Sequence, residues 1–467
     1  MTLKLYNTMS RSLTDLTPVK PGQVSLYACG PTVYDHAHIG HARAVVAFDV
    51  LTRYLASQGF KVEYARNFTD VDDKIINKAN DLGQPWLELA EKYIDSFTQD
   101  MAALGCLPPT YAPRATNYIA EMLEDIESLI ARGHAYELSG DVYFDVKSCQ
   151  EYGLLSRRKL DDQEAGARVA VDSRKKDASD FALWKSSRPG EPSWPSPWGE
   201  GRPGWHTECS AMSYRLLGAS FDIHGGGNDL IFPHHENELA QALALGRPMA
   251  SVWAHNGFVT IDKAKMSKSG GNARNVKDIL KIYPPEVARY FLLSHQYRMP
   301  INYTEDSLLD SWRALERIYR TLALEFEPLK SDALEPLEVM KGRVRFAEAM
   351  DDDLNTAAAL GVVFDMAHAL NRVAQEGQGQ LASHYRQAIL DFGQIFALWQ
   401  DRPETFLELK KPSSSQVEKE LVESIIERRV KARNQKDWAE ADRLRQELTD
   451  LGVILEDKAG QTTWRYA

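Results

Sequence analysis

The first strongly patterned part of the chain places a helical repeat between two short apolar runs. Residues 24–29 form an apolar run that ends at a Gly-Pro pair, which is typical of a buried strand closed by a turn. Residues 38–58 carry apolar side chains at helical spacing, and Gly59 can end that helix. Residues 61–67 predict a second strand. This order indicates a βαβ unit, so we expect a parallel sheet in an α/β domain.

The pattern further along predicts additional units. The chain is helical in pattern from about 82 to 132, and rich in Pro and Gly between 188 and 204. Strand patterns return at 220–224 and 250–261, and residues 284–399 are almost wholly helical in pattern. A Pro- and Ser-rich linker, a charged helical hairpin and a short tail follow. We interpret the middle as an insertion that splits one α/β domain into two halves.

Composition and charge narrow the class of protein. With 467 residues, 43% of them hydrophobic, the chain can bury large cores. A net charge of -11 argues against binding nucleic acid by bulk charge, although a local basic face remains compatible with it. No apolar run approaches the ~20 residues that span a bilayer, and the start lacks the apolar core of a secretion signal. The four cysteines have no framework spacing, so we expect a reducing, cytoplasmic location.

Two segments carry residues suited to phosphate groups. Residues 30–41 (GPTVYDHAHIGH) follow the first predicted strand and open the first helix, where backbone N–H groups favour an anion. On a helix His38 and His41 share one face, and Gly40 leaves room for a flat base. Residues 265–269 (KMSKS) precede two glycines and suit a loop that closes over pyrophosphate. Each segment taken alone has an alternative interpretation. Residues 30–41 could be an ordinary helix start, and residues 265–269 could be a solvated surface loop.

Cysteine, histidine and carboxylate residues form a third pattern. Cys29 ends the first predicted strand, and Cys209 lies in the segment WHTEC. In the segment FPHHENE, His234 and Glu238 are i and i+4, but His235 can also reach Glu238 at i+3, so the spacing leaves both open. The proline suits the first turn of a helix. Such residues are zinc ligands, although a buried inert thiol is the commoner interpretation of either cysteine alone.

The two phosphate segments together resemble the signature motifs of the class I aminoacyl-tRNA synthetases, in which both cradle ATP. Over the whole chain the pattern is similar to that of the cysteinyl-tRNA synthetases. The segments that carry this similarity are 29–34 (CGPTVY), 67–74 (NFTDVDDK), 204–210 (GWHTECS), 222–227 (DIHGGG), 232–238 (FPHHENE) and 350–356 (MDDDLNT). One departure is Gly270, which stands where the family usually has Leu and adds backbone freedom to the loop.

The resemblance implies a ligase that acts on L-cysteine, ATP with Mg²⁺, and tRNA(Cys), with one zinc ion per chain that binds the substrate thiolate. A metal is useful because an apolar pocket rejects near-isosteres by only about 1–3 kcal/mol, whereas zinc deprotonates and binds a thiol. We expect a monomer without a membrane partner and without an editing domain.

The resemblance also implies roles for individual residues. The catalytic residues would be His38, His41, Lys265 and Lys268. The ATP-binding residues would be Gly40, His38, His41, His224, Gly226, Asp229 and Lys268, with Asp229 also a candidate for the substrate ammonium. The cysteine-binding residues would be Cys29, Gly30, Thr69 and Trp205. The metal ligands would be Cys29, Cys209, His234 and Glu238. Arginines and aromatics on the C-terminal helices suit tRNA binding, namely Arg428, Arg429, Arg433, Trp438 and Trp464.

The implied fold is a Rossmann-like parallel-sheet catalytic domain split by an insertion, followed by an all-α helical bundle and a small C-terminal anticodon-binding domain. The expected boundaries are 1–110 and 204–260 for the two catalytic halves, 111–203 for the insertion, 261–305 for a junction domain with the KMSKS loop, 306–400 for the bundle, 401–416 for the linker and 417–467 for the anticodon-binding domain.

Two other interpretations stay open. A ligase that joins cysteine to an amino sugar in mycothiol synthesis resembles the same core but lacks an anticodon domain, so residues 417–467 argue against it. A non-catalytic tRNA- or zinc-binding relative is disfavoured by the intact motif residues. Charging of tRNA(Cys) would exclude the first, and cysteine-dependent ATP–pyrophosphate exchange would exclude the second.

Overall fold

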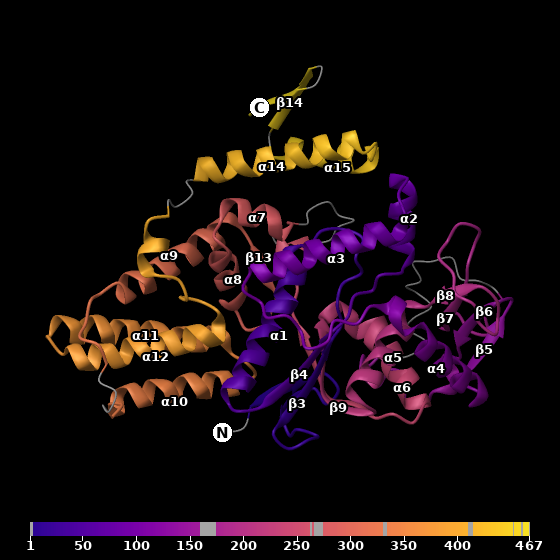
Figure 1. The fold of residues 1–467 in the computed structure, drawn as a ribbon, viewed down its shortest axis with the longest axis horizontal. Helices are drawn as coiled ribbons and strands as arrows, with labels where there is room; N and C mark the ends of the chain where they lie inside the picture. Colours follow the sequence, from indigo (N-terminus) through magenta and orange to yellow (C-terminus); the bar gives the residue numbers. More distant parts are fainter. Residues whose placement is uncertain are drawn as a thin grey trace.

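The computed structural model describes residues 3–158, 174–261, 264–265, 274–329, 334–409, 414–451, 453–458 and 461–466. Figure 1 shows a central α/β unit with a small sheet-containing unit on one side and a helical bundle on the other. Two helices and a β-hairpin from the end of the chain lie across the top of this assembly (Figure 1). None of the helices in the described ranges is both long and apolar enough to cross a membrane.

The central sheet has four parallel strands in the order β10-β9-β3-β4. These strands are β3 (Gln23–Ala28), β4 (Lys61–Arg66), β9 (Ser220–Gly227) and β10 (Met249–Asn256). The predicted strands at 24–29, 61–67 and 220–224 and the parallel sheet are therefore confirmed. The chain runs from β3 to β4 on one side of the sheet and from β9 to β10 on the other. The switch point between β3 and β9 is where open α/β sheets bind ligands.

Helices cover both faces of this sheet. Leu26 and Ala28 of β3 pack in the large core with α1 (Ile39–Ser57), whereas Tyr27 between them packs with Cys209 of α5 (Trp205–Leu217). Successive side chains of a strand point to opposite faces, and a sheet buried on both faces has continuous apolar strands. That explains why residues 24–29 lack a polar alternation.

The predicted strand 250–261 is divided by the structure into two strands of different sheets. β10 ends at Asn256, and β11 (Val259–Ile261) pairs with β13 (Ile301–Tyr303) and β12 (Ala264–Lys265). The chain turns at Gly257, where a Cβ atom would lie 2.5 Å from the carbonyl oxygens of Arg298 and Met299. Apolar periodicity cannot show that the neighbouring backbone leaves no room for a side chain at this position.

Between the two halves of the α/β unit, an antiparallel sheet forms with its own core around Phe144, Leu183 and Trp184. Its strands are β5 (Ala135–Leu138), β6 (Asp141–Phe144), β7 (Phe181–Ser186) and β8 (Gly201–Pro203). The helical pattern from about 82 to 132 corresponds to α3 (Trp86–Ala103) and α4 (Ile119–Ala131), which follow α2 (Asp73–Leu82). A non-helical stretch with a short 3-10 turn separates α3 from α4.

Residues 284–399 are mainly helical, as predicted, with one short strand, β13, among the helices. From residue 276 the helices are α7 (Val276–Ile282), α8 (Pro285–Leu293), α9 (Glu305–Leu322), α10 (Leu337–Asp351), α11 (Thr356–Gln375) and α12 (Gly379–Phe396). Two buried arginines join this part to α1: Arg43 donates to the Leu292 carbonyl at 2.6 Å, and Arg289 pairs with Asp49. The predicted linker 401–416 contains a further helix, α13 (Pro403–Leu407), because Phe406 is buried against Tyr319.

The predicted charged hairpin consists of α14 (Ser414–Asn434) and α15 (Trp438–Asp450). The tail that follows forms an antiparallel pair, β14 (Val453–Lys458) and β15 (Gln461–Tyr466). Side chains of the hairpin form ion pairs with α7, with its N-terminal flank and with α2. These pairs are Arg274 with Glu447, Arg428 with Asp278 at 3.6 Å, Lys281 with Glu427 at 3.2 Å, and Lys78 with Asp437 at 3.1 Å.

Candidate active site and metal centre

A compact set of sulfur, nitrogen and oxygen donors lies where β3 meets α5 and α6 (Glu236–Ala244). One ligand atom each from Cys29, Cys209, His234 and Glu238 lies within 4.8 Å of the others. The Glu238 Oε1 atom is 3.0 Å from His234 Nε2 and accepts from Cys29 Sγ at 3.4 Å. Cys29 is half-buried, and the other three residues are buried. The fold therefore brings together ligand atoms from three segments that are far apart in the sequence, around residues 29, 209 and 234–238.

A second set of four donors shares two members with the first. It combines Cys29 and Glu238 with His224 and His235, again within 4.8 Å. His235 Nε2 lies 4.0 Å from Glu238 Oε1, whereas its Nδ1 is 2.8 Å from His255 Nε2. His235 is thus partly committed to His255, which lies on β10. A helical turn at Ile231–His235, non-helical only at Phe232, runs directly into α6, so Pro233 lies in the first helical turn after this kink, as expected.

Burial dominates the electrostatics of this donor set. It raises the pKa of the Cys29 and Cys209 thiols and lowers the pKa of His234 to about 3. Burial alone would raise the pKa of Glu238, but His224 and His234 hold it below its usual range. Neutral thiols and neutral imidazoles that surround one carboxylate are suited to a divalent cation, because a cation favours the thiolate and displaces the thiol protons.

Trp205 and His206 fix the orientation of His234. The Trp205 ring stacks on the His234 ring with 4.3 Å between centroids and 22° between planes. The Nδ1 atoms of His206 and His234 are 3.0 Å apart, and Gln241 donates to the His206 carbonyl at 2.8 Å. The His206 contact is made at Nδ1 of His234, while Nε2 of the same ring lies 3.0 Å from Glu238 Oε1. Trp205 therefore lies beside the donor set, and His206 is a supporting residue that the sequence analysis missed.

Gly30 and Thr69 lie beside the donor set. A Cβ atom on Gly30 would lie 1.7 Å from the Asn67 carbonyl oxygen, so only glycine fits there. The Gly30 amide donates to Asn67 Oδ1 at 2.8 Å. Thr69 is buried and donates its hydroxyl hydrogen to Glu208 Oε2 at 2.6 Å. Burial raises the pKa of Glu208 well above its usual range, with nearby acids adding to the effect. Glu208 is a second residue that the sequence analysis missed.

The two histidines of the phosphate segment form the N-terminus of α1. His38 is the N-cap, and its Nδ1 accepts from the His41 amide at 3.3 Å, while His41 Nδ1 accepts from the His38 amide at 3.2 Å. The rings stack with 3.6 Å between centroids. Because each Nδ1 is an acceptor, each neutral ring carries its hydrogen on Nε2, which is a donor suited to phosphate oxygens. Gly40 lies in the first turn of α1, between His38 and His41 in the sequence.

Residues 274–276, which follow the KMSKS loop, form backbone hydrogen bonds with residues 37–39 at the start of α1. The Ile39 amide donates to the Arg274 carbonyl and the Val276 amide donates to the Ala37 carbonyl, both at 2.9 Å. The described residues that follow the loop therefore lie against the histidine segment. The Lys265 backbone belongs to β12, whereas Lys268 and Gly270 lie outside the described residues.

The residues predicted to bind ATP from β9 have different surroundings. His224 is fully buried, and its Nε2 lies 3.6 Å from Cys29 Sγ, on the side of the metal ligands. A Cβ atom on Gly226 would lie 2.9 Å from the His235 ring, so this glycine allows close packing of that histidine. Asp229 is exposed in the turn after β9.

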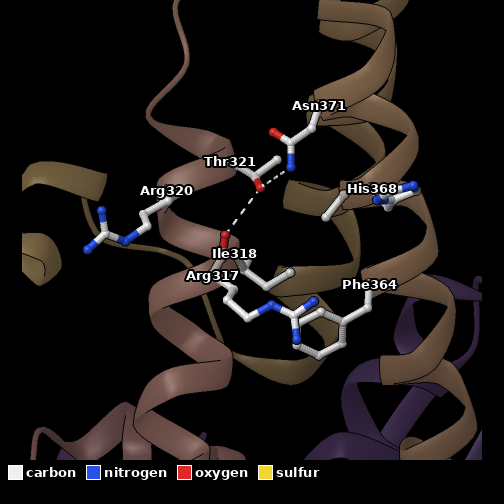
Figure 2. Close-up of a pocket in the computed structure, with 8 residues that line it drawn as sticks. Arg317, Ile318, Arg320, Thr321, Phe364, His368 and Asn371 are labelled. Atoms are coloured by element: carbon white, nitrogen blue, oxygen red, sulfur yellow. Dashed lines mark hydrogen bonds between the residues drawn. The ribbon is translucent and has the colours of Figure 1, made fainter.

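A separate cavity of about 270 Å³ lies between α9 and α11 (Figure 2). Arg317 lies over the Phe364 ring at 5.1 Å from its centroid, and Asn371 donates to Thr321 at 3.0 Å. The residues that line it include one histidine, His368, and neither a cysteine nor an acid. Its lining lacks the sulfur, carboxylate and paired histidine groups that lie at the strand ends, so the candidate site is the one at the sheet.

Three family profiles and full-length relatives match this chain. The profile described as "tRNA synthetases class I (C) catalytic domain" matches residues 15–313, "DALR domain" matches 345–400, and "Cysteinyl-tRNA ligase anticodon binding domain" matches 419–465. The cysteine–tRNA ligase of Geobacter sulfurreducens is 50% identical over 479 residues, and that of Pseudomonas aeruginosa is 48% identical over 467 residues. Each alignment covers 100% of both chains. The chain belongs to the cysteine–tRNA ligase family.

Solved structures agree with this family at the level of the fold. Methionyl-tRNA synthetase of Mycobacterium tuberculosis, bound by methionyl-adenylate, superposes with a TM-score of 0.60 at 15% identity and covers 85% of this chain and 96% of its own. The expected class I architecture is confirmed: a parallel-sheet catalytic domain, a helical DALR domain and a C-terminal anticodon-binding domain.

The anticodon-binding domain is the C-terminal unit of this chain, and the five predicted tRNA-binding residues differ in their accessibility. Trp438 is 61% exposed, and Arg433 is also exposed. Arg428 forms ion pairs with Asp278 at 3.6 Å and Glu440 at 3.7 Å. Arg429 is buried, and Trp464 packs against the small core of this unit. In this arrangement, two of the five residues are open to a large partner.

Proposed function

We propose that this cysteine–tRNA ligase selects its amino acid through a zinc ion held by Cys29, Cys209, His234 and Glu238. The observation that carries the proposal is the meeting of these four ligand atoms, within 4.8 Å of one another, beside the switch point of the sheet. When bound, zinc supplies a soft Lewis acid that ligates and deprotonates a substrate thiol, whereas a serine hydroxyl gains little from it.

The residues present fit such an ion. Two thiols, one imidazole and one carboxylate form a donor set typical of zinc, whereas the set with His224 and His235 offers only one thiol. Glu238 Oε2 is buried, lies 3.3 Å from His224 Nε2 and makes no hydrogen bond in the described part of the chain. A buried acceptor of this kind is normally satisfied by a donor or a metal. Trp205, stacked on His234, would then form a wall of the pocket for the small side chain of cysteine.

For the activation step we propose that His38 and His41 donate from Nε2 to the phosphates of ATP. Lys265 and Lys268 would neutralise the charge that develops on pyrophosphate, together with Mg²⁺. The amino-acid carboxylate attacks the α-phosphate in line, so catalysis consists of positioning and charge neutralisation, without a covalent enzyme intermediate. The terminal ribose hydroxyl of tRNA(Cys) then attacks the carbonyl of cysteinyl-adenylate.

The match of residues 419–465 to an anticodon-binding domain supports a tRNA as the acceptor and disfavours an amino sugar. Full-length protein should therefore catalyse cysteine-dependent ATP–pyrophosphate exchange and charge tRNA(Cys). Exchange with cysteine should exceed exchange with serine by more than about 200-fold, which is beyond what an apolar pocket provides. Metal analysis of the same preparation should give one zinc per chain. Comparable exchange with serine, or a fully active preparation without metal, would refute the proposal.

A further inference from the structure

The cavity between α9 and α11 has two polar ends and an apolar floor (Figure 2). Arg317 lies beside the Phe364 ring at one end, and Thr321 lies beside Asn371 at the other. The floor includes Ile318, which is fully buried. The volume of about 270 Å³ lies just below the roughly 300–1,000 Å³ of pockets for drug-sized ligands, so the cavity suits a smaller molecule.

No acidic side chain neutralises Arg317 within the described ranges, where its guanidinium forms neither an ion pair nor a hydrogen bond. The neighbouring acids on the two helices are Glu316 and Asp365. Glu316 pairs with Arg320 at 2.5 Å, and Asp365 pairs with Arg345 at 2.6 Å. The residues that line the cavity include no acid at all. The cavity therefore has a positive potential that favours an anion.

Both ends present hydrogen-bonding groups in fixed positions. Stacking on Phe364, with 5.1 Å to the ring centroid, covers one face of the Arg317 guanidinium and leaves the N–H groups at its edge free to donate. The Thr321 hydroxyl donates to the Arg317 carbonyl at 3.1 Å and accepts from Asn371 Nδ2 at 3.0 Å. This bond orients the Asn371 amide, whose second N–H and carbonyl oxygen are available to a ligand. The exposed His368 completes the polar lining.

We propose that this cavity binds a small phosphate monoester of the size of a sugar phosphate. The phosphate group lies against Arg317, whose planar fork donates to two phosphate oxygens at once. The hydroxyl groups of the sugar bond to the amide of Asn371, and its carbon skeleton lies over Ile318. Because duplex RNA is far wider than a cavity of this volume, a free metabolite fits it better than a nucleic-acid backbone.

The position of the cavity gives such a ligand a structural consequence. The helix α9 begins inside the segment that matches the catalytic-domain profile, and α11 lies inside the segment that matches the DALR domain. A ligand held by both helices therefore bridges the two units. It binds the folded protein only, so it should also raise the Tm.

Titration of full-length protein with ribose 5-phosphate, followed by calorimetry, tests the proposal. We expect saturable binding with a Kd of about 1 mM or lower. Arg317→Met, which keeps an unbranched side chain against Phe364, should weaken it at least about tenfold through loss of the charged hydrogen bonds. Arg313→Gln is the matched control, because Arg313 lies on the same helix, pairs with Asp310 at 2.5 Å and does not line the cavity. Both variants should retain cysteine-dependent ATP–pyrophosphate exchange.

The dependence on Arg317 separates this cavity from the histidine segment, since phosphate bound there would be insensitive to the substitution. Ribose without phosphate should show no binding. Equal affinity of Arg317→Met and the parent protein for ribose 5-phosphate would place the ligand elsewhere and overturn the proposal, as would the absence of binding at about 10 mM. A variant that loses affinity for tRNA(Cys) in filter binding, in a protein that does not bind ribose 5-phosphate, would assign the cavity to an RNA phosphodiester instead and would equally overturn it.

Discussion

At the scale of single residues, the four proposed metal ligands come from different kinds of element. Cys29 follows a central strand and is half-buried, whereas Cys209, His234 and Glu238 are buried on or just before helices. Cys29 is thus the ligand that substitution changes with least disturbance of the core. Serine retains the size of the side chain but replaces a thiolate by a neutral hydroxyl, which is a poor zinc ligand.

We therefore expect Cys29→Ser to lower zinc affinity by at least about 10- to 100-fold, since even changes beyond the ligands have effects of that size. The KM for cysteine should rise with it. Metal analysis after dialysis against a chelator and exchange kinetics provide the two readouts. Cys149→Ser is the matched control, because Cys149 packs in the core of the separate antiparallel sheet and should retain the metal. Unchanged zinc content and KM in Cys29→Ser would contradict the ligand assignment.

Residue spacing alone predicted part of this site. Spacing on a helix left His234 and His235 as equal candidates for a partner of Glu238, and only the family resemblance chose between them. In the structure His234 is the nearer, at 3.0 Å against 4.0 Å, and His235 is engaged by His255 of β10. His255 is 20 residues further along the chain, so no local pattern can reveal that contact. Glu208 was missed for a similar reason, since its partner Thr69 follows another strand.

At the scale of elements, the local residue pattern predicted the βαβ unit closely. It failed where contacts with distant parts of the chain determine whether a helix forms. The strand β3 and the helix α1 lie within a residue or two of the predicted 24–29 and 38–58. The helix α13, in contrast, occurs in a stretch whose prolines and serines indicated a linker. Its burial depends on the ring of Tyr319 on α9, 4.5 Å from the Phe406 ring. No residue pattern near Phe406 indicates that Tyr319 packs against it.

The helix α8 contains a carboxyl group whose environment makes the bundle sensitive to pH. Glu286 accepts from the Tyr319 hydroxyl at 2.7 Å and from the Trp399 amide, and so joins α8 to α9 and to the end of α12. Burial raises the pKa of Glu286 from 4.5 to about 7. Between these pH values the folded state binds more protons than the unfolded state, so the free energy of unfolding falls as pH rises.

Glu286→Gln should remove this dependence. Its amide can still accept from Trp399 and can donate to Tyr319, without a charge to bury. We expect the variant to be more stable than the parent at pH 8, on the order of 2 kcal/mol, and close to it at pH 4.5. Urea unfolding of both proteins across this pH range measures the difference. A stability difference that does not vary with pH would contradict the assignment of the shift to Glu286.

At the scale of the whole molecule, the anticodon-binding unit contacts the catalytic domain beside the ATP motifs. Its ion pairs with Arg274 and Asp278 lie at the start of α7, and Asn275 between them forms a β-bridge with His38. Arg428 is engaged in one of these pairs, so a tRNA that uses this arginine must separate it from Asp278. Partly exposed ion pairs contribute about 0–1 kcal/mol each, which permits such an exchange.

The C-terminal unit has its own small core around Val422, Ile425 and Leu444, distinct from the core of the catalytic domain. Removal of residues 417–467 should therefore leave the sheet, the proposed metal ligands and the histidine segment intact.

We expect the truncated protein to retain cysteine-dependent ATP–pyrophosphate exchange within about threefold of the full chain, because the lost contacts are mainly ion pairs. Its kcat/KM for charging tRNA(Cys) should fall by about 100-fold or more, since the contacts to unpaired anticodon bases are lost. Glu447→Gln, which removes the charge that pairs with Arg274 and with Arg443 but keeps the C-terminal unit, is the matched control and should keep both activities. If the truncated protein charges tRNA as efficiently as the full chain, the tRNA is recognised elsewhere, and the exposed Arg433 and Trp438 have another role.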